Sequence, residues 1–226
     1  KQRKNTLLSL FIYCSVSIKI KTANTGDFSD YSVTAGITNP QKRCYRLEGY
    51  LYPDTYTFYE NSAPEDVIKK ILQNTQKKLV GKYSHPDMTL DEIVTLASLI
   101  EKEGGGNPAE SGKISSVLHN RLKKGQPLQL DAPIYYLEND MGDADTQKYK
   151  IWYNTYNYQN REVKYDCPGL PAGAICSPSA ASLKAAANPE NTDYLYFGSD
   201  SSKNYFYAAT FDEFKAKGAE LGVNIR

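Results

Sequence analysis

One glutamate in the chain is placed for acid–base chemistry. Glu101 lies near the end of the segment TLDEIVTLASLIEKEGGG, four residues after Ala97 on the apolar stripe of an expected helix. A helix C-terminus and apolar neighbours both disfavour a negative charge, so they favour a carboxyl group that keeps its proton. Such a group can protonate the leaving oxygen of a glycosidic bond. The alternative interpretation is a solvated glutamate in an EKE turn at the surface.

The helix that positions Glu101 is marked at both ends. Thr89 and Glu92 have the spacing of a capping box, and glycines 104–106 end the helix. The spacing of apolar residues predicts a buried stripe formed by Ile93, Leu96, Ala97 and Ile100. We expect a second helix over 108–123, stopped by Gly125, with an inward face formed by Ile114, Val117, Leu118 and Leu122.

The remaining elements predict a mixed α+β fold. Strict alternation over 12–20 predicts a strand, and 21–46 is rich in turn formers and reads as loop and linker. Ser62 and Glu65 suggest a capping box that opens a helix running to Leu79. A further helix should follow Ser177, with Pro178 in its first turn. DYLYFGSD and NYFYAAT predict a hairpin, and a terminal helix follows it.

Several other classes of chemistry are poorly supported by the residues. His85 and His119 sit in contexts that do not place a base beside a Ser, Cys or Thr nucleophile, which argues against a protease or esterase. The glycines at 104–106 follow a helix and do not form a phosphate-binding loop. The 27 basic and 26 acidic side chains nearly cancel, so nucleic acid is not an expected partner. The 19 tyrosines fit a sugar-binding surface, or half-buried positions in sheets and loops.

Four cysteines, Cys14, Cys44, Cys167 and Cys176, show no metal-binding spacing, so no metal or other cofactor is expected. Cys167 and Cys176 bracket a Pro/Gly-rich loop and could pair in an oxidising compartment, or remain buried thiols. The opening apolar run, LLSLFIYCSV, is too short to span a bilayer, and a chain that starts without Met can lack a signal or an anchor.

Six blocks in the second part of the chain carry a family resemblance. LEGYLYPDTYTF, LASLIEKEGG, VLHNRLKKGQPLQLDAPIYY, YNTY, GLPAGAICSPSAASLKAAANP and YLYF occur in the order seen in the YceG-like (MltG) endolytic murein transglycosylases. The resemblance implies a YceG-like catalytic domain over 47–226. Residues 1–46 are expected to form a strand and linker, the remnant of a LysM-like small domain.

The resemblance also implies the reaction and its site. It assigns the first glutamate of the EKE block, Glu101, as the single catalytic acid/base, which cleaves the bond between MurNAc and GlcNAc and leaves a 1,6-anhydro-MurNAc end. No second carboxylate and no cofactor are needed in that chemistry. The same blocks suggest a set of substrate-binding residues formed by Glu48, Tyr52, Asp54, Gln129, Asp131, Asn154, Thr155 and Tyr156.

Two other functions remain open on the sequence alone. A muramidase-type hydrolase would use Asp131 as a second carboxylate beside Glu101, whereas a non-catalytic module would only bind the cell wall. The resemblance implies peptidoglycan glycan strands as the substrate and peptidoglycan synthases as further partners. It also implies a site at the extracytoplasmic face of the bacterial membrane, with the membrane reached only through an anchor outside this chain.

Overall fold

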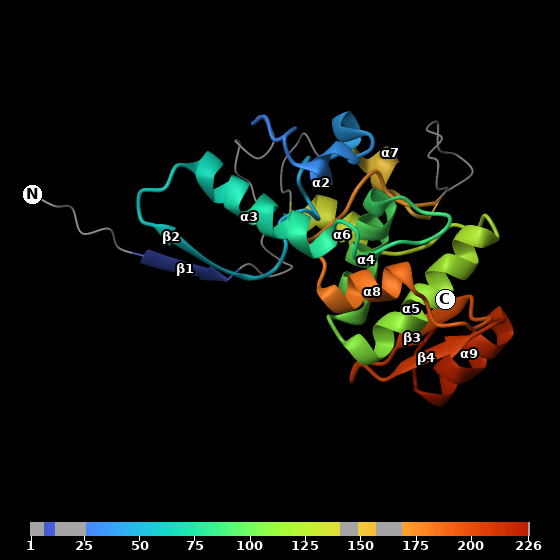
Figure 1. Cartoon of the computed structure of the whole chain (residues 1–226). Coiled ribbons are helices and arrows are strands. Elements are labelled where there is room, and N and C mark those ends of the chain that lie inside the picture. Colours follow the sequence, from blue (N-terminus) through green and yellow to red (C-terminus); the bar gives the residue numbers. More distant parts are fainter. Residues whose placement is uncertain (1–6, 12–25, 141–148, 157–168, 226) are drawn as a thin grey trace, which may run out of the picture.

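The computed structural model describes residues 7–11, 26–140, 149–156 and 169–225. Three helices, α4 (Leu90–Gly104), α5 (Pro108–Lys123) and α8 (Ala180–Ala187), pack against one another at the centre. Strands β3 and β4 and helix α9 lie at one end of the molecule, and the β1–β2 ribbon lies at the other (Figure 1). The α+β fold expected from the sequence is confirmed.

Helix α4 is the central element of the core. Thr89 forms the predicted capping box with Glu92, and Gly105 ends the helix in the left-handed conformation, with φ of 58°. Every residue over 93–100 is buried, so the helix is covered on all sides and not only along the predicted stripe. Burial of a helix on all its faces fixes its rotation, and therefore the direction of each side chain in its last turn.

Two of the predicted helix starts are wrong by one or two residues. The predicted capping box at Ser62 does not form, because α3 (Pro64–Leu79) has Ala63 as its N-cap, with Pro64 in the first turn. Pro178 precedes α8 and does not lie in its first turn, since the N-cap of that helix is Ser179. The helix over 108–123 is confirmed as α5, and its expected face is buried at Ile114, Val117 and Leu118.

The strands form two separate antiparallel ribbons. In one, β1 (Leu7–Phe11) pairs with β2 (Thr55–Tyr59), and Leu7 lies opposite Tyr59. In the other, β3 (Tyr196–Ser199) pairs with β4 (Tyr205–Ala208), which confirms the predicted hairpin. The terminal helix α9 (Phe211–Glu220) follows and packs on this hairpin. The strand predicted over 12–20 lies outside the described residues.

Short elements complete the described chain. They are α2 (Ser32–Ala35), the 3-10 turn η1 (Pro40–Lys42), α6 (Ala132–Tyr135), the π-helical turn η2 (Tyr136–Asp140) and α7 (Lys150–Tyr153). In the described part of the chain no helix is long and apolar enough to cross a membrane. Cys176 is buried and Cys44 half-buried, but Cys14 and Cys167 lie outside the described residues, so the pairing of Cys167 with Cys176 stays a prediction.

The segment before residue 47 is tied to the core through Asp91. This buried carboxylate accepts hydrogen bonds from the Thr38 backbone and hydroxyl, from Arg43, and from the Tyr50 hydroxyl at 2.6 Å. Three described segments therefore meet at the first turn of α4. The domain boundary near residue 46 stays a prediction, and the described residues 26–46 pack directly on the helical body.

Candidate active site

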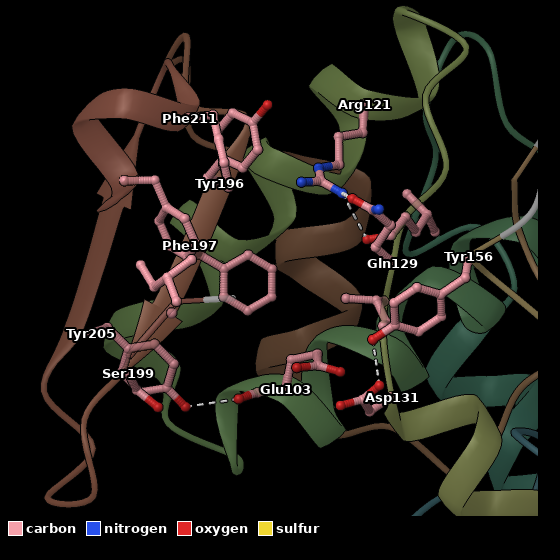
Figure 2. Close-up of a pocket in the computed structure, with 15 residues that line it drawn as sticks. Glu103, Arg121, Gln129, Asp131, Tyr156, Tyr196, Phe197, Ser199, Tyr205 and Phe211 are labelled. Atoms are coloured by element: carbon pink, nitrogen blue, oxygen red, sulfur yellow. Dashed lines mark hydrogen bonds between the residues drawn. The ribbon is translucent and has the colours of Figure 1, made fainter. Parts of the chain in front are cut away.

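A cavity of about 570 Å³ lies between the last turn of α4, the segment before α6, and the β3–β4–α9 unit. Glu103 lies between two contrasting walls (Figure 2). One wall is aromatic and includes Tyr196, Phe197 and Phe211, whereas the opposite wall carries Asp131 and Tyr156. A concave site of this size, with a few polar groups between apolar surfaces, is typical of small-molecule and substrate binding.

Glu103 is the carboxyl group best placed for proton transfer in this cavity. The pKa of its side chain is raised from 4.5 to about 7: burial is the largest cause, the charge of Asp131 adds to it, and a hydrogen bond from the Ala132 N–H opposes both effects. The backbone carbonyl of the same residue accepts a hydrogen bond from the Tyr205 hydroxyl at 2.7 Å, which ties the helix end to β4. A carboxyl group with a pKa near neutrality can both give and take a proton.

Asp131 and Tyr156 form a hydrogen-bonded pair that faces Glu103. The Tyr156 hydroxyl donates to an oxygen of Asp131, and both side chains line the cavity. Desolvation, this hydrogen bond and the charge of Asp131 all raise the pKa of Tyr156, so the hydroxyl keeps its proton and remains a donor. The pair therefore holds a negative charge beside Glu103 in a fixed position.

The segment that carries Asp131 is held by residues of the YNTY block. Thr155 is fully buried, and its hydroxyl both accepts from the Leu130 N–H and donates to the Leu130 carbonyl, each at 2.9 Å. The Thr155 carbonyl accepts from the Gln129 N–H at 3.0 Å. The Asn154 side chain accepts from the Tyr156 N–H at 2.9 Å. These contacts give Asn154 and Thr155 a part in positioning the cavity wall.

Gln129 and Arg121 form the upper part of the cavity in Figure 2. Arg121 donates to the Gln129 side-chain oxygen at 3.0 Å and to the carbonyls of Pro127 and Leu128. Gln129 has a φ of 55°, which is uncommon for a residue other than glycine. Arg121 fixes the side-chain oxygen of Gln129, and the amide nitrogen of the same side chain is a donor that a ligand can use.

Glu101 has a different environment from Glu103. One of its carboxylate oxygens accepts from the Ser179 hydroxyl and the Ser182 hydroxyl, each at 2.6 Å, and from the Ser179 N–H at 3.1 Å. These donors lie at the N-terminus of α8, where a negative charge is favoured. Glu101 does not line the cavity. Its contacts join α4 to α8, because three donors of the α8 N-terminus meet on one carboxylate oxygen.

The other predicted substrate-binding residues lie outside the cavity lining. Glu48 is buried and accepts from the Tyr136 hydroxyl at 3.4 Å. Asp54 accepts from the Asn74 side chain at 2.9 Å, a bond that lowers the pKa of Asp54, and it lies beside Lys78. The ring of Tyr52 lies under the Lys78 ammonium group. Of the eight predicted binding residues, the cavity brings together Gln129, Asp131 and Tyr156.

The sequence did not identify Glu103 and the aromatic wall as parts of the candidate site. The pattern could have pointed to Glu103, since it lies three residues after Ile100 and seven after Leu96, on a buried face of α4. No sequence pattern pointed to Phe211 or Phe214, because their side chains meet the cavity only after the hairpin and α9 have packed. The described residues contain no group of three or more side chains suited to hold a metal ion.

Comparisons with known proteins agree with this architecture. The model of the YceG-like family matches residues 14–220. The endolytic murein transglycosylase of Streptococcus pneumoniae serotype 2 is 33% identical over 183 residues, which cover 80% of this chain and 33% of that protein. The endolytic murein transglycosylase of Bacillus subtilis strain 168 is 33% identical over 191 residues, 83% of this chain and 51% of that protein.

A solved structure shows the same fold. The crystal structure of a YceG-like protein from Listeria monocytogenes superimposes with a TM-score of 0.68 and 29% sequence identity, and the match covers 87% of this chain and 66% of that chain. This chain thus spans a third of the pneumococcal relative and about half of the Bacillus relative. The family match covers most of the chain, and the two relatives are more than 30% identical to it. The chain therefore belongs to the YceG-like family.

Proposed function

We propose that this chain is the catalytic part of an endolytic lytic transglycosylase that cleaves peptidoglycan glycan strands, with Glu103 as its acid and base. The observation that carries the proposal is a single carboxyl group with a pKa of about 7 inside a cavity of about 570 Å³. The relatives named endolytic murein transglycosylases support the substrate and the type of reaction.

In the first half of the reaction, protonated Glu103 gives its proton to the glycosidic oxygen between MurNAc and GlcNAc. The bond from that oxygen to C1 of MurNAc breaks, and the oxygen leaves as the hydroxyl of GlcNAc. In the second half, the C6 hydroxyl oxygen of MurNAc bonds to C1, and its proton passes to the Glu103 carboxylate. Glu103 is thereby returned to its acid form, no water is consumed, and the product has a 1,6-anhydro end.

The geometry supports Glu103 over Glu101 as the proton donor. One carboxylate oxygen of Glu101 is bound by the hydroxyl groups of Ser179 and Ser182, and Glu101 does not line the cavity. Glu103 lines the cavity, and its raised pKa lets it carry the proton that the reaction requires. The catalytic role predicted for Glu101 stays a prediction, and the two assignments give opposite results with matched variants.

A second candidate function is favoured by one observation, the presence of Asp131 in the same cavity as Glu103. In a muramidase-type hydrolase, Glu103 would protonate the leaving oxygen, while Asp131 would act as the nucleophile or would activate water. The Tyr156 hydroxyl that binds Asp131 occupies one of its oxygens, which makes Asp131 a weaker nucleophile. This contact favours the transglycosylase over the hydrolase.

The proposed substrate also implies a cellular location for the protein. A substrate in the murein layer implies that the protein acts at the extracytoplasmic face of the bacterial membrane. Enzymes that cut glycan strands act on the product of peptidoglycan synthases, and these are the proteins we propose as partners.

Mass spectrometry of the products separates the candidate functions. The protein and its Glu103→Gln variant are incubated with purified peptidoglycan, and the released fragments are analysed. Anhydro-MurNAc ends from the unaltered protein alone establish the transglycosylase and its dependence on Glu103. Reducing ends, heavier by one water, would establish the hydrolase. Binding without any released fragment from either protein would show a non-catalytic wall-binding module.

A further inference from the structure

Phe211 is an exposed aromatic side chain at the edge of the cavity. It is the first residue of α9, and 44% of its surface is exposed although it lines the cavity. The backbone at this point is fixed by Thr210, whose hydroxyl accepts from the Glu213 N–H while the Glu213 carboxylate accepts from the Thr210 N–H. A capped helix start gives Phe211 a fixed position.

Neighbouring side chains hold Phe211 and leave part of it exposed; among them is Lys215, whose ammonium group lies 5.0 Å from the centroid of the Phe211 ring. Its ring centroid lies 5.7 Å from that of Tyr196 and 6.4 Å from that of Phe214, with tilted planes in both contacts. The Arg121 guanidinium packs over the ring of Tyr196, 5.1 Å from its centroid. An aromatic side chain that is held at its edge and exposed to solvent costs little entropy when it stacks on a ligand.

The cavity has a second exposed ring on its opposite side. Tyr156 is 42% exposed, and its hydroxyl is bound to Asp131. Glu103 lies between this wall and the aromatic wall that contains Phe211 (Figure 2). A strand laid across Glu103 would therefore meet an aromatic ring on each side.

The chemistry of both walls fits a hexosamine unit. A pyranose ring has apolar C–H faces and a rim of hydroxyl and amide groups, so it requires an aromatic surface together with hydrogen-bonding groups. Phe211 and Phe214 supply apolar surface, while Gln129, Ser199 and Asp131 supply polar groups in the same cavity. The apolar chain of a lipid would leave these polar groups unpaired.

We propose that Phe211 is a sugar-binding platform, on which one N-acetylhexosamine unit of the glycan strand stacks while the linkage beside it lies at Glu103. The inference rests on the proposed function, and it adds a specific binding position formed by α9. The platform holds the strand on the aromatic side of the cavity, so it contributes to binding of the substrate and takes no part in proton transfer.

Binding is measured in the Glu103→Gln background, which prevents cleavage. The probe is a soluble tetrasaccharide of alternating GlcNAc and MurNAc, titrated by calorimetry. We expect Phe211→Ala to weaken binding about tenfold, and Phe211→Tyr, which keeps the ring, to retain the affinity within about twofold. Leu221→Ala is the matched control, because Leu221 is a comparably exposed apolar residue at the other end of α9 and does not line the cavity.

The outcomes separate this inference from the proposed function. If the tetrasaccharide binds but Phe211→Ala and Leu221→Ala have equal affinity, the platform is refuted and the proposed function stands. Equal weakening in Phe211→Ala and Phe211→Tyr also refutes it, because the ring is then not the binding feature. If the unaltered protein neither binds nor cleaves glycan strands, the proposed function fails and the platform fails with it.

Discussion

Glu101 and Glu103 leave the last turn of α4 on different sides, and they reach different parts of the molecule. Two residues on a helix are separated by ~200° around its axis, so side chains at this spacing do not face the same neighbours. Glu101 reaches the serines at the start of α8, whereas Glu103 reaches the cavity beside Asp131. One carboxylate joins two helices, and the other is available to a substrate.

The first prediction compares the two glutamates directly. We expect Glu103→Gln to reduce the rate of glycan cleavage by about a thousandfold, because the amide cannot donate and recover a proton. Glu101→Gln should retain cleavage within about tenfold, and it should lower the free energy of unfolding by about 1–2 kcal/mol through weaker bonds to Ser179 and Ser182. Release of muropeptides and thermal unfolding measure the two effects.

Both variants keep the size of the side chain, so each serves as the control for the other. The opposite result would be a folded Glu101→Gln protein that has lost cleavage and a Glu103→Gln protein that retains it. That result would support Glu101 as the catalytic acid, as the EKE block predicted, and would refute Glu103.

The second prediction concerns pH. The reaction begins with protonated Glu103, whose pKa is raised to about 7. As the pH rises through this value the acid form is lost, so kcat/KM should fall about tenfold for each pH unit above about 7. An initial-rate profile on soluble glycan strands measures this. A rate that keeps rising up to pH 9 would show that the proton donor is not Glu103.

The third prediction concerns the negative charge beside the acid. Asp131→Asn removes a charge that raises the pKa of Glu103, so this pKa should fall and the descending limb of the pH profile should move to lower pH. The pKa should remain above 4.5, because burial is the larger cause of the shift. Activity should persist at pH values below the new pKa of Glu103, and the same profile of rate against pH measures it.

Complete loss of activity at every pH in a folded Asp131→Asn protein would contradict this tuning role. It would instead favour the hydrolase, in which Asp131 takes part in the chemistry itself.

The fourth prediction concerns the support of the cavity wall. Thr155→Val removes a buried hydroxyl but keeps the shape of the side chain, so the N–H and carbonyl of Leu130 lose their partner. We expect the free energy of unfolding to fall by about 1–3 kcal/mol. Thr57→Val, at an exposed position of β2, is the matched control and should change stability by less than about 0.5 kcal/mol. Equal effects of both substitutions in denaturant titrations would refute the role given to Thr155.

Local patterns predicted much of the fold, because they depend on neighbours in the chain. The capping box of Thr89 with Glu92, the glycine stop at Gly105 and the hairpin of β3 with β4 were all predicted and are confirmed. The errors were also local. Ser62 and Pro178 carry valid start signals, but competing residues at Ala63 and Ser179 form the actual caps.

The sequence by itself determined the family blocks, the α+β class and the helix end that carries Glu101 and Glu103. The sequence pattern pointed to Glu101 alone, and it contained nothing to show which of the two side chains lines a cavity. That choice depends on residues far away in the chain. Ser179 and Ser182 supply donors to Glu101, while burial and the charge of Asp131 act on Glu103. A pKa depends on the charges and solvent around a group in space, and only the packed structure provides them.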